Sequence, residues 1–177
     1  EDGHKDIFRP ISEGNLGKFY QGKMDIFYFF FHLALNIGRE NSQITFITTN
    51  YYPTASGAEK LRLDLKNRSI VRNLINYSEL RIFESAKGQH NMITILSKGN
   101  DTNYIANNCE TNRKGTANPQ TLKLILDWAD AETNYYKVYQ KYLYDGKKNY
   151  LRLSGISEDT ENPINKILNK IKKNSTG

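Results

Sequence analysis

The sequence predicts an α/β domain, and two observations on residues 23–98 predict it. Helical and extended patterns alternate along this stretch, which is typical of a parallel sheet covered by helices. The two strand-like segments at its end are separated by too few residues for a crossover helix, so we expect them to pair antiparallel. The expected order is helix, strand, helix, strand, strand, with the last strand reversed.

The first expected helix covers residues 24–37, and apolar side chains occupy nearly its whole circumference. Such a helix is buried on most sides, as when it lies against a sheet. The first expected strand, residues 44–49, contains no charged residue, which is typical of a strand buried on both faces. The polar residues of the helix region fall at three- and four-residue steps and should form one narrow stripe: Asp25, Tyr28, His32, Asn36 and Arg39.

Further elements follow along the chain, with weaker patterns after Gly99. A second helix is expected from residue 55 or 56 to about residue 67, and strands are expected at residues 70–77 and 91–98. The later patterns predict a strand at 104–109, a polar loop at 107–119, a helix at 121–131, a strand at 135–144 and its hairpin partner at 149–153. Asn162 and Pro163 have the residue types of a helix start, so the C-terminal extension should be of α+β type.

Composition and charge fit one domain, or a domain piece with an appendage, in a chain of 177 residues. Hydrophobic residues make up 38% and are clustered, as burial of a core requires. The net charge of +6 is compatible with a polyanion partner such as nucleic acid, and equally with a lysine-rich solvated surface. A single cysteine, no signal peptide and no apolar run of ~18 residues lead us to expect a cytoplasmic protein without a membrane partner.

Catalytic and metal-binding patterns are not found in the sequence. The histidines His4, His32 and His90 have no neighbours at metal-ligand spacing, and Cys109 has no signature around it. Neither a dinucleotide-binding glycine motif nor a P-loop occurs, and the acidic residues form no evident acid/base pair. We therefore expect no catalytic residue, no cofactor-binding residue and no metal site within these residues.

The segment Asn50-Tyr51-Tyr52-Pro53 follows the first expected strand. It shares residue types with Asn-Pro-Pro-Tyr, with which amino-methylating enzymes hold a target base, but the order differs and Pro-Pro is missing. We interpret it as a turn. The turn still follows the carboxyl end of a strand, where open α/β sheets place their ligands.

Taken together, the chain resembles the second half of the methyltransferase domain in gamma-class N6-adenine DNA methyltransferases of restriction-modification systems, most closely of the type IIG kind. The resemblance covers about residues 18–100 well and the remainder loosely. Residues 140–153 and 162–171 look like the connector that precedes the target-recognition domain of such enzymes. The resemblance rests on the order and spacing of these segments: Asp25-Ile26-Phe27, residues 44–50, Gly57 with Leu61-Arg62, residues 82–86 and residues 93–98.

The resemblance implies the back half of a Rossmann-like methyltransferase sheet. Residues 1–22 would be the loop after the parent's catalytic motif, residues 23–115 the C-terminal half of the methyltransferase domain, and residues 116–177 the connector. The family's glycine-rich cofactor loop and its Asn-Pro-Pro-Tyr motif are missing, so we expect a fragment of a longer enzyme. S-adenosylmethionine is then the cofactor of the parent, and the fragment alone should neither bind it nor methylate.

One functional residue of the family matches a residue of this sequence. In the family's Phe-x-x-Ala segment an aromatic ring stacks on the flipped adenine, and Phe83 stands at that position. An enzyme acting on a base amino group takes the base out of the duplex, and a flat ring replaces the lost stacking. Double-stranded DNA with a flipped adenine is thus the implied partner. Arg81 and Lys87 flank the ring and could contact phosphates, as could the turn at Tyr51.

Two other functions stay open on the sequence. The chain could be a stand-alone basic nucleic-acid-binding module that uses the lysines and tyrosines of its last third, in which case residues 100–177 alone should bind plain DNA with a strong salt dependence. It could also be an α/β protein-interaction module, with Phe83 serving as core filler.

Overall fold

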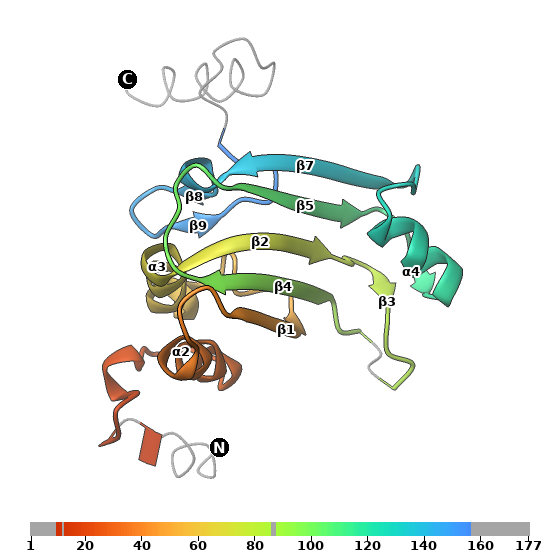
Figure 1. Cartoon of the computed structure of the whole chain (residues 1–177). Helices are drawn as coiled ribbons and strands as arrows, with labels where there is room; N and C mark the ends of the chain where they lie inside the picture. Colours follow the sequence, from red (N-terminus) through yellow and green to blue (C-terminus); the bar gives the residue numbers. More distant parts are fainter. Residues whose placement is uncertain (1–9, 12, 86–87, 157–177) are drawn as a thin grey trace, which may run out of the picture.

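The computed structural model describes residues 10–11, 13–85 and 88–156, and its centre is a mixed five-stranded sheet (Figure 1). The strand order is β1-β4-β2-β5-β7. β4 is antiparallel to both β1 and β2, β5 is parallel to β2, and β7 is antiparallel to β5. The strands are β1 (Gln43–Thr49), β2 (Ser69–Asn76), β4 (Asn91–Lys98), β5 (Ile105–Thr111) and β7 (Thr133–Tyr139).

Short elements connect and flank this sheet. Two small strand pairs lie outside it: β3 (Leu80–Arg81) with β6 (Gly115–Thr116), and β8 (Tyr144–Asp145) with β9 (Tyr150–Leu151). The helices are α2 (Phe27–Ile37), α3 (Glu59–Arg68) and α4 (Pro119–Leu126), with single 3-10 turns at η1 (Gly17–Phe19), η2 (Ser56–Ala58) and η3 (Gln140–Tyr142).

The predicted α/β class and the order helix, strand, helix, strand, strand are confirmed, with α2, β1, α3, β2 and β4 in these places. The reversed last strand is also confirmed, and it lies between the two earlier strands. The hairpin around Asp145-Gly146 forms as β8 and β9. The helix expected at residues 162–171 lies outside the described residues.

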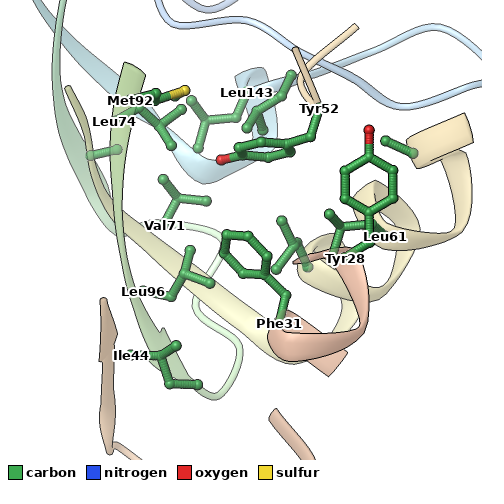
Figure 2. Close-up of a cluster of buried hydrophobic side chains, with 14 of the residues drawn as sticks. Tyr28, Phe31, Ile44, Tyr52, Leu61, Val71, Leu74, Met92, Leu96 and Leu143 are labelled. Atoms are coloured by element: carbon green, nitrogen blue, oxygen red, sulfur yellow. The ribbon is translucent and has the colours of Figure 1, made fainter. Parts of the chain in front are cut away.

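The main core fills the space between the sheet and the helices α2 and α3 (Figure 2). Alternation along the strands points one set of side chains toward the helices, including Val71, Leu74, Met92 and Leu96. The ring of Tyr52 is buried in this cluster, and its hydroxyl lies 2.7 Å from Thr94 Oγ1. A second, smaller core on the opposite face lies against α4 and is formed by Ile75, Tyr77, Leu80, Cys109 and Ile125.

Helix α2 differs from its expected orientation. Tyr28 and His32, which were assigned to a polar stripe, are buried. His32 Nδ1 lies 2.5 Å from Asp64 Oδ2 on α3, and the ring of Phe19 stacks on the imidazole. Tyr28 and His32 therefore lie inside the molecule, while Asp25, Asn36 and Arg39 are exposed as expected. The helix region also exposes four apolar side chains: Ile26, Phe30, Leu33 and Ile37.

Strand β1 was expected to be buried on both faces, and this is wrong. Ile44 is buried against the helices, whereas Thr45 and Ile47 are exposed on the other face. Within the described residues β1 pairs with β4 alone, so it forms an edge of the sheet. An absence of charge did not distinguish this edge strand from a central one, because threonine and isoleucine suit both positions.

Three element boundaries in the second half also need correction. β5 continues to Thr111, into residues expected to form a loop. α4 ends at Leu126, well before residue 131, and β7 ends at Tyr139, where η3 begins. Trp128 has a φ of 61°, in the left-handed region, which cannot continue a right-handed helix.

Candidate functional site

The carboxyl ends of β1, β2 and β5 meet at one edge of the sheet, because the three strands run in the same direction (Figure 1). Two connections begin there. The turn at residues 50–55 follows β1, and the segment at residues 77–90 leads from β2 to β4. The first connection contains Tyr51 and the second contains Phe83. Both residues, which the sequence predicted to contact DNA, therefore lie in segments that follow the carboxyl ends of strands.

Phe83 follows β3 and is 44% exposed, so it is not core filler. The chain before it is fixed from two sides. β3 pairs in parallel with β6, and the Ala117 backbone N–H donates to the Arg81 carbonyl at 2.8 Å. Ile82 packs against the smaller core. The residues before Phe83 are thus anchored, while its ring faces solvent.

A buried arginine, Arg62, fixes the turn that contains Tyr51. Tyr51 is 53% exposed, whereas its neighbour Tyr52 is buried. Arg62 on α3 is fully buried, and its Nη1 donates to the carbonyls of Tyr52 at 2.8 Å and Ala55 at 2.7 Å. Burial lowers the pKa of the Arg62 guanidinium, and Tyr150 opposes this shift. The turn therefore takes its shape from a side chain on the following helix.

The C-terminal hairpin closes on the same turn. Arg62 Nε donates to the Lys148 carbonyl at 3.1 Å, and its guanidinium carbon lies 5.0 Å from the centre of the Tyr150 ring. The Leu151 backbone N–H donates to the Pro53 carbonyl at 3.0 Å. A segment nearly a hundred residues away in sequence thus fixes the turn that presents Tyr51.

Of the two basic residues predicted to flank Phe83, the structure describes Arg81 but not Lys87. Arg81 is partly exposed, and its Nη2 donates to Thr116 Oγ1 at 2.8 Å, which directs the guanidinium along β6. Lys87 lies outside the described residues. The structure therefore brings Tyr51, Arg81 and Phe83 to one edge and gives no account of Lys87.

Sequence reasoning missed a polar row at this edge. Asn50, Asn76 and Glu110 stand at or just after the carboxyl ends of β1, β2 and β5 and are joined by hydrogen bonds. His90 Nδ1 lies 2.7 Å from the Ser78 carbonyl beside them. The available signal was that two asparagines and a glutamate each come at the end of an extended segment.

Reactive and metal-binding groups do not form a second site in the described part of the chain. Cys109 is buried, and this burial raises the pKa of its thiol to about 11, so it is protonated at neutral pH. No group of three or more His, Cys, Asp or Glu side chains in the described ranges could hold a metal ion. Nor does any described helix have the length and apolar character needed to cross a bilayer.

Comparison with known proteins gives a family match for the first part of the chain. Residues 1–83, a little under half of the chain, match the model of the Eco57I restriction-modification methylase family. The match contains α2, β1, α3, β2 and β3 and ends at Phe83, while β4 to β9 lie beyond it. No curated protein matches the chain.

Two solved structures share the fold of this chain. One is the type IIG restriction endonuclease BpuSI, with a TM-score of 0.53 and 13% identity over 78% of this chain. The other is a modification subunit of a putative type I restriction enzyme from Vibrio vulnificus YJ016, with a TM-score of 0.51 and 10% identity over 79% of this chain. The chain spans only 16% and 33% of these two proteins, respectively.

Proposed function

We propose that this chain forms the target-base side of an S-adenosylmethionine-dependent DNA methyltransferase that modifies the N6 amino group of adenine. The family match and the two similar restriction-modification structures support the reaction class. The missing cofactor and catalytic motifs support a division of labour, in which another part of a longer protein holds the methyl donor. We expect the 177 residues alone to bind no S-adenosylmethionine and to transfer no methyl group.

The observation that supports this proposal most is the exposed ring of Phe83 at the carboxyl edge of the sheet. A base rotated out of a duplex loses its stacking partners, and an aromatic ring can replace one of them. Base–aromatic stacking contributes about 1–3 kcal/mol per base. Tyr51 and Arg81 then contact the displaced strand or its phosphates, and Lys87 joins them as the third DNA-binding residue.

The outer edge of β1 supports the placement of the remaining methyltransferase strands. This edge has no partner within the described residues, and α2 lies next to β1 (Figure 1). The α2 region exposes the apolar side chains of Ile26, Phe30, Leu33 and Ile37. Unpaired backbone groups beside apolar side chains are suited to a further strand and helix. Residues 1–22 then follow the catalytic motif, residues 23–115 complete the methyltransferase domain, and residues 116–177 lead to the target-recognition domain.

Substitution of Phe83 tests the proposal directly. In the full-length protein, Phe83→Ala should lower methylation of the target DNA by about 5- to 100-fold, as expected from the loss of one base–aromatic stack. Incorporation of labelled methyl groups from S-adenosylmethionine measures the rate. Tyr139→Ala is the matched control, because Tyr139 is also 44% exposed but lies on β7. Equal rates for wild type and Phe83→Ala, with the fold intact, would refute the assignment.

A further inference from the structure

The turn between α4 and β7 lies at one end of the sheet and contains Trp128, whose side chain is 37% exposed (Figure 1). The backbone of Trp128 has a φ of 61°, the left-handed conformation in which helices commonly end on glycine. A residue with a side chain adopts this conformation at an energetic cost. A large aromatic residue therefore stands where glycine would fit best, and strained residues of this kind cluster at functional sites.

The indole ring of Trp128 is held in a fixed orientation by a second ring. It stacks on Tyr135 of β7, with ring centres 4.8 Å apart and planes 24° apart. The Tyr135 hydroxyl is itself fixed, because it donates to the Ile125 carbonyl at 3.2 Å and accepts from the Asp130 backbone N–H at 3.2 Å. The exposed ring is thus oriented before any ligand reaches it, which lowers the entropic cost of binding.

The charge beside this ring is positive. Lys137 follows Tyr135 by two residues on β7, so both side chains are on the same face of the strand. Its Nζ lies 6.0 Å from the centre of the Trp128 ring and forms no ion pair with any described residue. The three acidic residues closest to the ring in sequence are all paired, Asp127 with Lys123 and both Asp130 and Glu132 with Arg113. An uncompensated cation therefore accompanies an exposed aromatic ring.

We propose that Trp128 and Lys137 bind an unpaired nucleotide of a nucleic acid strand, with the base stacked on the indole and the phosphate beside the ammonium group. Every base has a flat π face, so a ring of this kind binds bases without selecting their sequence. The lysine adds an attraction for phosphate that an apolar protein partner would not use. A duplex keeps its bases inside the stack, so the site binds single strands in preference to double-stranded DNA. This surface does not depend on the methyltransferase function proposed above.

Binding of a labelled thymidine oligonucleotide to the full-length protein tests the stacking role. Fluorescence anisotropy measures the dissociation constant, and excess unlabelled duplex occupies the sites for double-stranded DNA. Trp128→Gly removes the ring and suits the left-handed backbone, so it should weaken binding by about 5- to 100-fold while the protein stays folded. Trp128→Phe keeps a stacking face and should retain most of the affinity.

A control and a second variant separate stacking from other effects of the substitution. Leu126→Ala removes an apolar side chain that is 52% exposed at the same end of α4 but has no π face, and it should bind like wild type. If thermal unfolding shows that Trp128→Gly is not folded, Trp128→Leu takes its place, because it keeps an apolar side chain on Tyr135 and should lose the same affinity.

A salt titration tests the phosphate contact. For a single strand, each neutralised phosphate contributes a slope of about 0.7 to the fall of log affinity with log salt concentration. Lys137→Gln should reduce the slope by about this amount. Lys147→Gln removes the same charge from the exposed turn between β8 and β9 and should leave the slope at the wild-type value.

The polymer that supplies the nucleotide is identified by a parallel titration with a uridine RNA oligonucleotide, since stacking and a phosphate contact are possible with either. Wild-type affinity in Trp128→Gly and Trp128→Leu for both oligonucleotides would overturn the inference. So would equal losses in Leu126→Ala and Trp128→Gly, because the surface would then act by apolar contact, as in docking to a protein. An unchanged salt slope in Lys137→Gln would overturn the role of the lysine.

Discussion

Strand β2 is joined to its two neighbours in different ways. Toward β4 it forms a backbone ladder along its whole length, from Ser69 opposite Lys98 to Asn76 opposite Met92, with one irregularity between Val71 and Asn73. Toward β5 only Ile75 and Asn76 are in backbone register. Backbone hydrogen bonds therefore join β2 to β4 along the whole strand, whereas they join β2 to β5 at one end only.

Side-chain amides of Asn73, Asn108 and Gln140 replace the missing backbone bonds, and we call this junction the amide seam. Gln140 imitates a peptide group: its oxygen accepts from the Val71 N–H at 2.8 Å, and its nitrogen donates to the Val71 carbonyl at 2.7 Å. Asn108 is fully buried, accepts from the Leu74 N–H at 3.0 Å and donates to the Leu153 carbonyl at 3.0 Å. Asn73 Nδ2 donates to the Asn107 carbonyl at 2.9 Å.

The difference teaches where this fold tolerates substitution. A backbone ladder accepts many side chains, because its hydrogen bonds come from peptide groups that every residue except proline provides. The amide seam depends on three particular side chains. Each of these side-chain bonds between β2 and the segments beside it can therefore be removed by one substitution.

The largest expected effect is at the amide seam. Gln140→Leu removes both partners of the buried Val71 peptide groups, and each unsatisfied group costs about 1–3 kcal/mol, so the free energy of unfolding should fall by about 2–6 kcal/mol. Urea denaturation followed by circular dichroism measures the change. Gln120→Leu makes the same replacement at an exposed position of α4 and should alter stability by less than about 0.5 kcal/mol. Similar stability of the two variants would mean that the amide seam is not needed.

A second effect lies on the other side of β5, where an ion pair holds the turn before β7. Asp130 is buried, and its bonds to Arg113 keep the pKa of its carboxyl at about 2. Because this pKa is lower in the folded than in the unfolded protein, the stabilisation is complete above about pH 4 and is lost as pH falls toward 2. Asp130→Asn should lower stability at pH 7 by about 1.5–3 kcal/mol, as for a hydrogen bond to a charged group.

Denaturation midpoints at several pH values test this ion pair. The difference between wild type and Asp130→Asn should shrink steadily between pH 4 and pH 2. Asp127→Asn is the control, because Asp127 pairs with Lys123 on the exposed end of α4. A constant difference between wild type and Asp130→Asn down to pH 2 contradicts the ion-pair explanation.

The smallest effect is expected beside the backbone ladder. Thr94 lies on β4, and in the described part of the chain its hydroxyl is hydrogen-bonded to that of Tyr52, so Thr94→Val leaves the pairing of β2 with β4 in place. One buried hydroxyl contact is lost, which should cost about 1 kcal/mol in thermal or urea unfolding. Thr45→Val, on the exposed face of β1, serves as the control and should be neutral. A loss for Thr94→Val as large as that for Gln140→Leu would remove the contrast between the two junctions.

The sequence predicts the half of the sheet that is built by apolar strands. Residues 44–49, 70–77 and 91–98 are strands close to their expected bounds, because clustered Ile, Val and Leu side chains bury against α2 and α3. It predicts less about β5, whose Asn107 and Asn108 have low strand propensity. They lie in a strand because they pair with Lys137 and Tyr136 of β7, and Asn108 is also held by side-chain bonds to Leu74 and Leu153. These partners are distant in sequence, so no local pattern contains them.

The residues of the candidate site also fall into two groups, those that the sequence predicted and those that it did not. Phe83 and Tyr51 were identified because short segments around them resemble a family or follow a strand. Asn50, Asn76 and Glu110 were missed, because their meaning arises only when β1, β2 and β5 bring their carboxyl ends together. The edge position of β1 was also missed, since it depends on which strands pair and not on the composition of β1 itself.

The place of β4 between β1 and β2 has a consequence for synthesis on the ribosome. The two flanking strands emerge first, and neither can form its ladder until residues 91–98 leave the exit tunnel. A nascent chain that stops at residue 83, where the family match ends, lacks the strand that both need. Such a truncated product should stay unfolded and be cleared by proteases, whereas chains extended past Lys98 should gain resistance in one step.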